Sequence, residues 1–514
     1  MRNQKIIHAA LVIMLLMIGS LSHAKPFISK FSQQELAFMP AHVQVKLFKT
    51  GVIKPIDVVE AQIQQIEKTN KEINAITYQH FQTARERAYE SAKRYASGTQ
   101  RPLEGITVGL KDEHHEKGMK VTMGSVVHLN DAPKDYTDDV TQKLLDAGVI
   151  PLIQTTVPEL YLNFVTHSKA WGVTRNPWNP QYSVGASSGG SGAALAAGYV
   201  TLATGSDMGG SIRIPASVNG LYGFKPCFGE VFTETPLAPF SGTGPMARNA
   251  TDMIMMHNVI NGHSPNGVNL LPNRQYPTEY QDLKGVKIAY VGGMGITKPS
   301  REVDEAMDDA ILDLQARGAV VQEVALDFGI SADSLRNGFK NLALSGAMGA
   351  GFQAYYNDME EMTGYAATFI KATVEADYGK DQQLDAELMI KGMYAAIHRE
   401  VFSKGFDLMI CPTVATPHIP ADYDFTKDTV EEEGVRYDAF VGTLYTMPFN
   451  LLNFMPVVSA PVGLSGQNMP IGIQFIGKPY DTEMVFRVVS NFEEETAELY
   501  KNKGYKKQMT LLDL

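Results

Sequence analysis

Hydrophobic positions in the first hundred residues mostly follow helical spacing. The segment SQQE at 32–35 matches a capping box that opens a helix. Val59, Ile63 and Ile66 share one face of a second helix, which starts after Pro55, and a charged third helix is expected over 81–96. Most apolar runs come later in the chain, so we expect these helices to cover a core that later segments form.

Further along, short apolar runs alternate with helical patterns. Runs typical of buried strands lie at 105–110, 149–154, 285–291, 319–324, 408–411 and 471–476. A helix is expected over 140–147. Another carries Val303, Met307, Ile311 and Leu314 on its apolar face and ends at Gly318. This alternation predicts a layered α/β protein with helices on both faces of a sheet.

The segment from about 331 to 400 has helical patterns and no strand pattern. Aromatic residues and methionines are concentrated in it: Phe339, Met348, Phe352, Tyr355, Tyr356, Met359 and Tyr365. Such residues usually form core. The alternative interpretation is a helical insertion that walls a substrate pocket.

The first 24 residues have the pattern of a signal peptide. Arg2 and Lys5 precede an almost wholly apolar run at 6–18, and the segment SHA at 22–24 suits cleavage after Ala24. The apolar run is shorter than the ~20 residues of a spanning helix, which makes an uncleaved anchor the weaker alternative. We therefore expect a periplasmic or secreted mature protein without a membrane span.

Composition and charge narrow the range of partners. The 514 residues are 44% hydrophobic and 20% charged, which is typical of a globular protein. A net charge of -11 argues against nucleic acid or an anionic membrane surface, since both require basic patches. Cys227 and Cys411 are flanked by apolar residues and proline, so we expect two buried free thiols.

Two glycine-rich segments, at 185–192 and 205–213, are the candidate active-site loops. Glycine lets a backbone adopt positive φ and approach a ligand closely, and free N–H groups ahead of a helix can bind a negative oxygen. Neither segment ends as a phosphate loop does. GASSG at 185–189 matches a G-x-S-x-G nucleophile elbow, but a loop with two prolines at 176–183 precedes it where the elbow needs a strand.

The block 176–226 resembles the amidase signature family, which includes fatty acid amide hydrolase, peptide amidases, 6-aminohexanoate cyclic dimer hydrolase and the glutamine-hydrolysing subunit of the transamidosome. The resemblance rests on GASSGGS at 185–191, GSDMGGSIR at 205–213 and GFKP at 223–226, with weaker similarity at 105–118, 156–159 and 470–474. It implies one large domain over 25–514, built on a mixed β-sheet, with a helical insertion at roughly 331–400 and no cofactor.

The resemblance also implies roles for individual residues. Ser211 corresponds to the nucleophile, Ser187 to a bridging serine on a cis peptide bond, and Lys111 to the base. The N–H groups of Met208, Gly209, Gly210 and Ser211 correspond to an oxyanion hole. Asp207 and Arg213 correspond to residues that hold the nucleophile loop in place. Tyr161 corresponds to a residue that lines the substrate channel. Ala186 and Cys227 replace a glycine and a threonine that are usual in the family.

Amide chemistry independently accounts for these residue types. The reaction needs a nucleophile, a proton shuttle and stabilisation of the carbonyl oxygen. Lysine is a base only when neutral, and burial lowers its pKa. Lys111 ends an apolar run, so we expect partial burial. The Ser187 hydroxyl can donate and accept at once, and can pass a proton between Ser211 and Lys111.

These observations predict an exported amidase that hydrolyses a linear or cyclic carbon–nitrogen amide bond of a small molecule. The alternatives are a glutamine-hydrolysing component of an amidotransferase, an esterase with the same machinery, and a periplasmic binding protein. His114 and His115, flanked by Glu113 and Glu116, could suggest a metal site. Adjacent side chains diverge on a strand or turn, whereas a metal needs three or four converging ligands, so we expect none.

Overall fold

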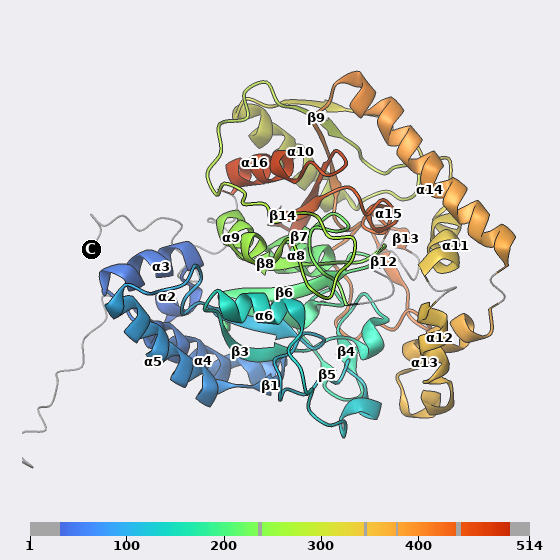
Figure 1. The fold of residues 1–514 in the computed structure, drawn as a ribbon. Helices are drawn as coiled ribbons and strands as arrows, with labels where there is room; N and C mark the ends of the chain where they lie inside the picture. Colours follow the sequence, from blue (N-terminus) through green and yellow to red (C-terminus); the bar gives the residue numbers. More distant parts are fainter. Residues whose placement is uncertain (1–30, 235–238, 344–346, 377–378, 438–443, 494–514) are drawn as a thin grey trace, which may run out of the picture. The chain divides into compact units, whose positions relative to one another are not determined.

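The computed structural model describes residues 31–234, 239–343, 347–376, 379–437 and 444–493, and the predicted signal peptide at 1–24 lies outside them. The chain separates into two units, residues 1–32 and 33–514. The second unit contains an eleven-stranded mixed sheet, in the order β1-β3-β2-β6-β8-β7-β14-β15-β11-β9-β10 (Figure 1). The mixed sheet and the single large domain agree with the sequence prediction.

The strands of this sheet are β1 (Ile76–Gln79), β2 (Thr107–Lys111), β3 (Ile150–Thr155), β6 (Leu202–Asp207), β7 (Tyr222–Lys225), β8 (Gly242–Ala247), β9 (Lys287–Tyr290), β10 (Val320–Glu323), β11 (Leu408–Pro412), β14 (Val457–Leu464) and β15 (Pro470–Gly477). Strands β3, β2 and β6 are parallel neighbours, as are β11, β9 and β10, and the other pairs are antiparallel. Two short hairpins pair β4 (His167–Ser168) with β5 (Gly172–Val173) and β12 (Val430–Glu432) with β13 (Val435–Tyr437).

Helices cover both faces of the sheet, as successive residues of β7 show. The Phe224 ring stacks edge-on against His257 of α9 (Ala250–Ile260) and Phe486 of α16 (Thr482–Phe492). A side chain at the preceding residue, Gly223, would instead meet Ala216 of α8 (Arg213–Asn219). Successive strand residues point to opposite faces, so α9 and α16 lie on one face and α8 on the other.

The expected N-terminal helices are present: α2 (Gln33–Phe38), α3 (Ala41–Thr50), α4 (Pro55–Ile73) and α5 (Phe81–Ser97). Val59, Ile63 and Ile66 of α4 are buried, as their spacing predicted. The predicted helices at 140–147 and around 303–314 correspond to α6 (Asp139–Asp146) and α10 (Arg301–Ala316). Helix α15 (Pro448–Leu451) precedes β14.

The glycine-rich segments are more regular than the sequence suggests. Residues 205–207, predicted as loop, belong to β6, and 189–192 begin helix α7 (Gly189–Ala196). A side chain at Gly189 would overlap Thr166, and one at Gly190 would overlap the backbone of Thr156. These glycines therefore permit close packing of a helix against its neighbours, which composition alone does not distinguish from a flexible loop. Strands β7, β8 and β14 were also not predicted.

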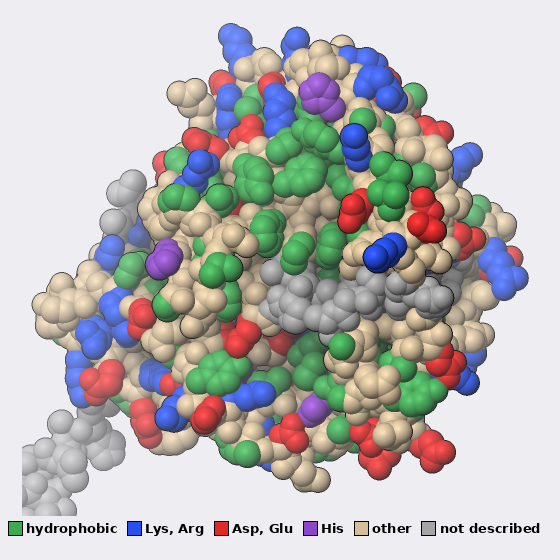
Figure 2. Space-filling view, turned by 45° about the vertical axis from the view of Figure 1, so that its right-hand side comes forward, with side chains coloured by type: hydrophobic (Ala, Val, Ile, Leu, Met, Phe, Trp, Pro, Cys, Tyr) green, Lys and Arg blue, Asp and Glu red, His purple; other side chains and the backbone are tan. Residues whose placement is uncertain are grey.

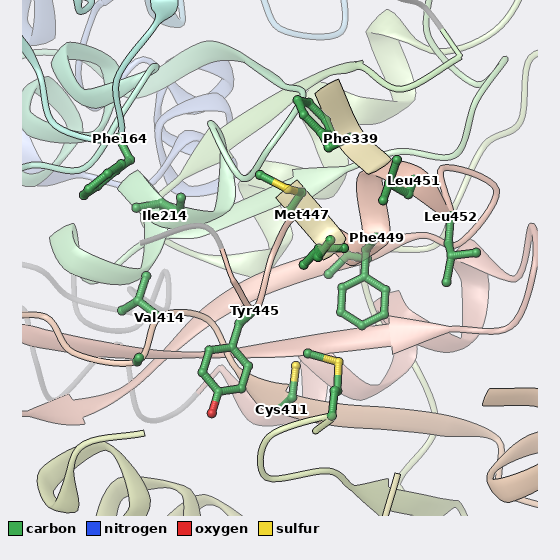
Figure 3. Close-up of a cluster of buried hydrophobic side chains, with 14 of the residues drawn as sticks. Phe164, Ile214, Phe339, Cys411, Val414, Tyr445, Met447, Phe449, Leu451 and Leu452 are labelled. Carbon is green, nitrogen blue, oxygen red and sulfur yellow. The ribbon is translucent and has the colours of Figure 1, made fainter. Parts of the chain in front are cut away.

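The segment 331–400 is helical, as expected. It contains α11 (Ala332–Ala343), α12 (Ala347–Gln353), η3 (Tyr356–Glu361), α13 (Gly364–Val374) and α14 (Lys380–Glu400). Phe339, Phe352 and Tyr365 are buried in a hydrophobic cluster, against which Tyr355, Tyr356 and Met359 pack, while the Met348 side chain lies outside the description. Figure 3 shows Phe339 in this cluster together with Phe164, Ile214 and Met447.

Cys227 and Cys411 are both buried free thiols, as predicted. Figure 2 shows basic and acidic side chains interspersed over one face. None of the helices in the described ranges is both long enough and apolar enough to cross a membrane.

Candidate active site

Lys111, the last residue of β2, lies at the centre of the candidate site. All five residues of β2 are buried, and the Lys111 side chain is 0% exposed. Its Nζ lies 2.9 Å from Ser187 Oγ and 2.7 Å from Ser206 Oγ. Burial lowers the pKa of Lys111, whereas Glu113 and Asp207 act to raise it, and burial has the larger effect.

Ser187 contacts Lys111 from the first glycine-rich segment. The Ala186–Ser187 peptide bond is cis, and Ser187 is 3% exposed. The next residue, Ser188, donates its N–H to the carbonyl oxygen of Ser211 at 3.1 Å. This bond joins the segment that bears Ser187 to the one that bears Ser211.

Ser211 lies in the turn between β6 and α8. The buried ion pair between Asp207 and Arg213 holds this turn in place. The Asp207 carboxylate accepts the Gly210 N–H at 2.8 Å and the Ile212 N–H at 3.2 Å. Arg213 donates to both Asp207 oxygens at 2.9 Å, and both side chains are 0% exposed. Burial alone would raise the pKa of Asp207, but Arg213 and further donors hold it well below its usual range.

The Arg213 guanidinium also donates to three groups from the C-terminal part of the domain: the carbonyl oxygen of Thr446, Gln474 Oε1 and Asn450 Oδ1, at 2.7 to 2.9 Å. Thr446 Oγ1 in turn donates to the carbonyl oxygen of Gly209 at 2.6 Å. Asn450 and Thr446 lie far from the signature block, and no pattern in the sequence predicted their part in the site. Gln474 falls in the weakly similar segment 470–474, which was the only available signal.

The proposed oxyanion donors differ in availability. The N–H groups of Met208, Gly209 and Ser211 have no hydrogen-bond partner among the described residues, whereas the Gly210 N–H already donates to Asp207. Gly210 has a φ of 124°, and a side chain there would overlap Thr446 Oγ1. This geometry therefore offers three free donors rather than the predicted four, and Gly210 fixes the shape of the turn.

These groups open onto a cavity of about 700 Å³. Ser187, Ser206 and Ser211 lie on its wall, and Lys111 lies behind them. Much of the remaining wall is apolar, from Leu160, Phe164, Ile214, Phe232, Phe339, Phe352, Tyr355, Phe369 and Met447. Phe339, Phe352, Tyr355 and Phe369 belong to the helical segment 331–400, and these residues both line the cavity and pack in or against the hydrophobic cluster.

Tyr161 lines the cavity and also covers the lysine. Its ring centroid lies 5.1 Å from Lys111 Nζ, and its hydroxyl donates to the carbonyl oxygen of Asp112 at 2.9 Å. The side chain therefore shields the amine from the cavity.

From the sequence, His114 and His115 were candidates only for metal ligands, and none was expected. Both are buried and line the same cavity. The two nitrogens of His114 face different carboxylates, Glu113 and Asp138, an arrangement unlike ligands that converge on one ion. Within the described ranges, the group with metal-ligand distances is Glu302, His418 and Glu432 instead.

Comparisons with known proteins agree with this fold. One component of the glutamyl-tRNA(Gln) amidotransferase of Carboxydothermus hydrogenoformans is 30% identical over 488 residues, covering 90% of this chain and 98% of the relative. A bacterial aryl acylamidase of the amidase signature family superimposes with a TM-score of 0.83 at 25% identity, over 92% of this chain and 99% of that one. The substrate complex of 6-aminohexanoate cyclic dimer hydrolase, at 24% identity and a TM-score of 0.76, shares the fold over 92% and 99% of the two chains.

The class that fold and relatives define is that of hydrolases acting on carbon–nitrogen amide bonds. The chain belongs to the amidase family, whose model, described as Amidase, matches residues 57–486. The predicted family, fold and enzyme class are thereby confirmed, and the interpretation as a binding protein is excluded.

Proposed function

We propose that this amidase works through Ser211 as nucleophile, Ser187 as proton carrier and Lys111 as base. The observation that carries this proposal is the 2.9 Å contact between Lys111 Nζ and Ser187 Oγ in a fully buried environment. A buried lysine loses its proton more readily than an exposed one, and a neutral amine can accept a proton from a hydroxyl.

In the proposed reaction, Ser187 gives its proton to neutral Lys111 and takes the proton of Ser211. Ser211 Oγ forms a bond to the amide carbonyl carbon, and the carbonyl oxygen becomes an anion. The proton then returns through Ser187 to the leaving nitrogen as the carbon–nitrogen bond breaks. Water releases the acyl group from Ser211 by the same relay.

The N–H groups of Met208, Gly209 and Ser211 are the proposed donors to the oxyanion. They are backbone groups in a turn fixed by the Asp207–Arg213 pair, so they need little reorganisation when charge develops. Gly210 contributes by holding the turn to Asp207. Loss of one such donor typically costs about 10²–10³ in rate.

The apolar wall supports a small-molecule amide with a sizeable apolar group as substrate. One observation favours a second candidate, the glutamine-hydrolysing component of an amidotransferase: relatives from glutamyl-tRNA(Gln) amidotransferases are about 30% identical over nearly the full chain. Free glutamine would leave much of this apolar wall unfilled. Hydrolysis of esters by the same groups is a third candidate, since esters have a better leaving group than amides.

Export is also proposed. The apolar run at 6–18 and the segment SHA at 22–24 support a signal peptide that is cleaved after Ala24. Expression of the full chain in a Gram-negative host, followed by fractionation and N-terminal sequencing, tests this. We expect a periplasmic or medium fraction that begins at Lys25; an intact N-terminus in the cytoplasm contradicts export.

The function itself is tested with a panel of carboxamides that includes anilides, fatty amides, peptide amides and glutamine, each beside its matched ester. Release of ammonia or amine is measured for the amides and release of the alcohol for the esters, with Ser211→Ala as the blank. Turnover of apolar amides in preference to glutamine supports the proposal. Turnover of glutamine alone favours the amidotransferase component, and turnover of esters alone favours the esterase.

A further inference from the structure

Four charged or titratable side chains extend in series from the centre of the site. Lys111 Nζ lies 3.5 Å from Glu113 Oε1, and the same Glu113 oxygen lies 3.4 Å from His114 Nε2. The other His114 nitrogen, Nδ1, lies 3.4 Å from Asp138 Oδ1. Cationic and anionic groups thus alternate: lysine, glutamate, histidine, aspartate.

The local fold builds this series. A turn after β2, closed by the His114 N–H donating to the carbonyl oxygen of Lys111 at 2.8 Å, returns Glu113 toward the lysine. Asp138 caps α6 by accepting the Thr141 N–H at 3.0 Å and the Thr141 hydroxyl at 2.7 Å. It also accepts the His115 N–H at 2.5 Å, so the carboxylate beside His114 is fixed.

The carboxylate of Glu113 affects the ability of Lys111 to act as a base. A carboxylate 3.5 Å from a buried amine stabilises the ammonium form and works against proton acceptance. A second cation beside the same carboxylate oxygen weakens this effect. His114 occupies that position, and Asp138 stabilises its protonated form.

We propose that Glu113 and His114 are positioning residues that together set the charge of Lys111: Glu113 favours the ammonium, and His114, fixed by Asp138, offsets Glu113 and so favours the neutral amine. This inference rests on the proposed function, because it assigns to Lys111 the role of base. Neither residue needs to touch the substrate for the effect to operate.

The titratable surroundings agree with this assignment. Lys111 faces Glu113, His114, Asp207 and the Tyr161 ring. Burial alone would lower the pKa of His114, but Asp138 and Glu113 raise it above its ordinary value. Burial alone would raise the pKa of Glu113, yet Lys111 and His114 lower it.

Further groups complete the environment. Asp112 and Tyr161 face Glu113, and burial raises the pKa of Asp112 to about 6, with Glu113 adding to the effect. His115 faces His114 and Asp138, and burial lowers its pKa. A positive group in this set is therefore expected at His114 rather than at His115.

The test is the pH dependence of Ser211 labelling by a fluorophosphonate probe, read by intact mass between pH 5 and 10. The rate rises with pH as the base loses its proton, and the position of this rise reports the charge state of Lys111. We expect Glu113→Gln to move the rise to lower pH and His114→Gln to move it to higher pH, each by about 1 to 3 units.

His115→Gln is the matched control. His115 is adjacent, buried and on the same cavity wall, but its Nδ1 lies 3.3 Å from the backbone carbonyl oxygen of Glu113 and not beside its carboxylate. Whatever its effect on rate, this variant leaves the position of the rise unchanged. Glu113→Asp keeps the carboxylate but moves it away from Lys111, because the side chain is one methylene shorter. It should therefore move the rise in labelling rate to lower pH, as Glu113→Gln does, but by a smaller amount.

The outcomes separate the two proposals. Labelling that persists in Ser211→Ala overturns the proposed function itself. If labelling requires Ser211, but the glutamine variants lower the rate at every pH without moving the rise, or move it in the same direction, the inference is wrong and the proposed function stands. Should Glu113→Gln fail to fold, Glu113→Asp and His114→Gln still decide the sign.

Discussion

The N–H of Ser188 donates to the carbonyl oxygen of Ser211 at 3.1 Å and joins two segments that are 23 residues apart in the chain. One segment bears Ser187 on a cis peptide bond beside Lys111, and the other bears the Ser211 turn. Because both ends of this bond are backbone atoms, side-chain substitutions at Ser187 and Ser211 leave it in place. Alanine variants of either serine are therefore expected to keep the site geometry, which makes their activities interpretable.

Loss of Arg213 is expected to destabilise the domain strongly. Asp207 would remain fully buried without its guanidinium partner, and an uncompensated buried charge typically costs about 3–5 kcal/mol. Urea denaturation of Arg213→Met measures the change in free energy of unfolding. Arg301→Met serves as the control, since Arg301 pairs with Glu305 where both side chains are 60% exposed, and we expect about 1 kcal/mol or less. Equal effects of the two variants would contradict the structural role of the buried pair.

Gly210→Ala is expected to distort the nucleophile turn. At a φ of 124° an added side chain is strained, and it would overlap Thr446 Oγ1. The neighbouring Gly209→Ala is the matched control, because a side chain there meets nothing within 4 Å. Thermal unfolding should show a lower Tm for Gly210→Ala than for Gly209→Ala. A Gly210→Ala protein as stable as Gly209→Ala would mean that the turn does not require this conformation.

His257 is expected to make the protein acid-sensitive. Neither ring nitrogen has a hydrogen-bond partner in the described part of the chain, and burial lowers the pKa of His257 to about 3 from an ordinary 6.5. The unfolded chain therefore binds a proton that the folded protein does not, between these two values. Stability should fall by about 1.4 kcal/mol for each pH unit below 6.5 from this group alone.

His257→Leu removes this contribution. The difference in free energy of unfolding between the wild type and this variant should be nearly constant above pH 7 and grow in favour of the variant as pH falls toward 4. A difference that does not change with pH would show that His257 has the same pKa in the folded protein as in the unfolded chain, and would contradict the prediction.

The candidate catalytic residues could be predicted from the sequence more readily than the residues that hold them in place. Ser187, Ser211, Asp207 and Arg213 lie within one contiguous block, whose spacing is informative, and Lys111 follows a recognisable apolar run. The groups that bind Arg213, at Thr446 and Asn450, come from more than 200 residues away and lie in no repeating pattern. Only the fold brings them together.

The secondary structure likewise contains segments that the sequence predicts and segments that depend on contacts made in the fold. Apolar runs such as β3 and β11 were predicted because their side chains alone indicate burial. The end of strand β6, residues 205–207, was predicted as loop because Gly205 and Ser206 are typical of loops, although pairing with β8 fixes these residues as strand. Glu113 was considered only as a neighbour of His114, because its proximity to Lys111 depends on a turn that no local pattern indicated.

Ser187→Ala and Ser211→Ala distinguish carrier from nucleophile most directly when both are treated with a fluorophosphonate and followed by intact mass over time. The wild type is expected to gain one adduct, Ser187→Ala to gain it much more slowly, and Ser211→Ala to gain none while its circular dichroism stays native. Labelling of Ser211→Ala together with an inert Ser187→Ala would assign the nucleophile to Ser187 and contradict the account.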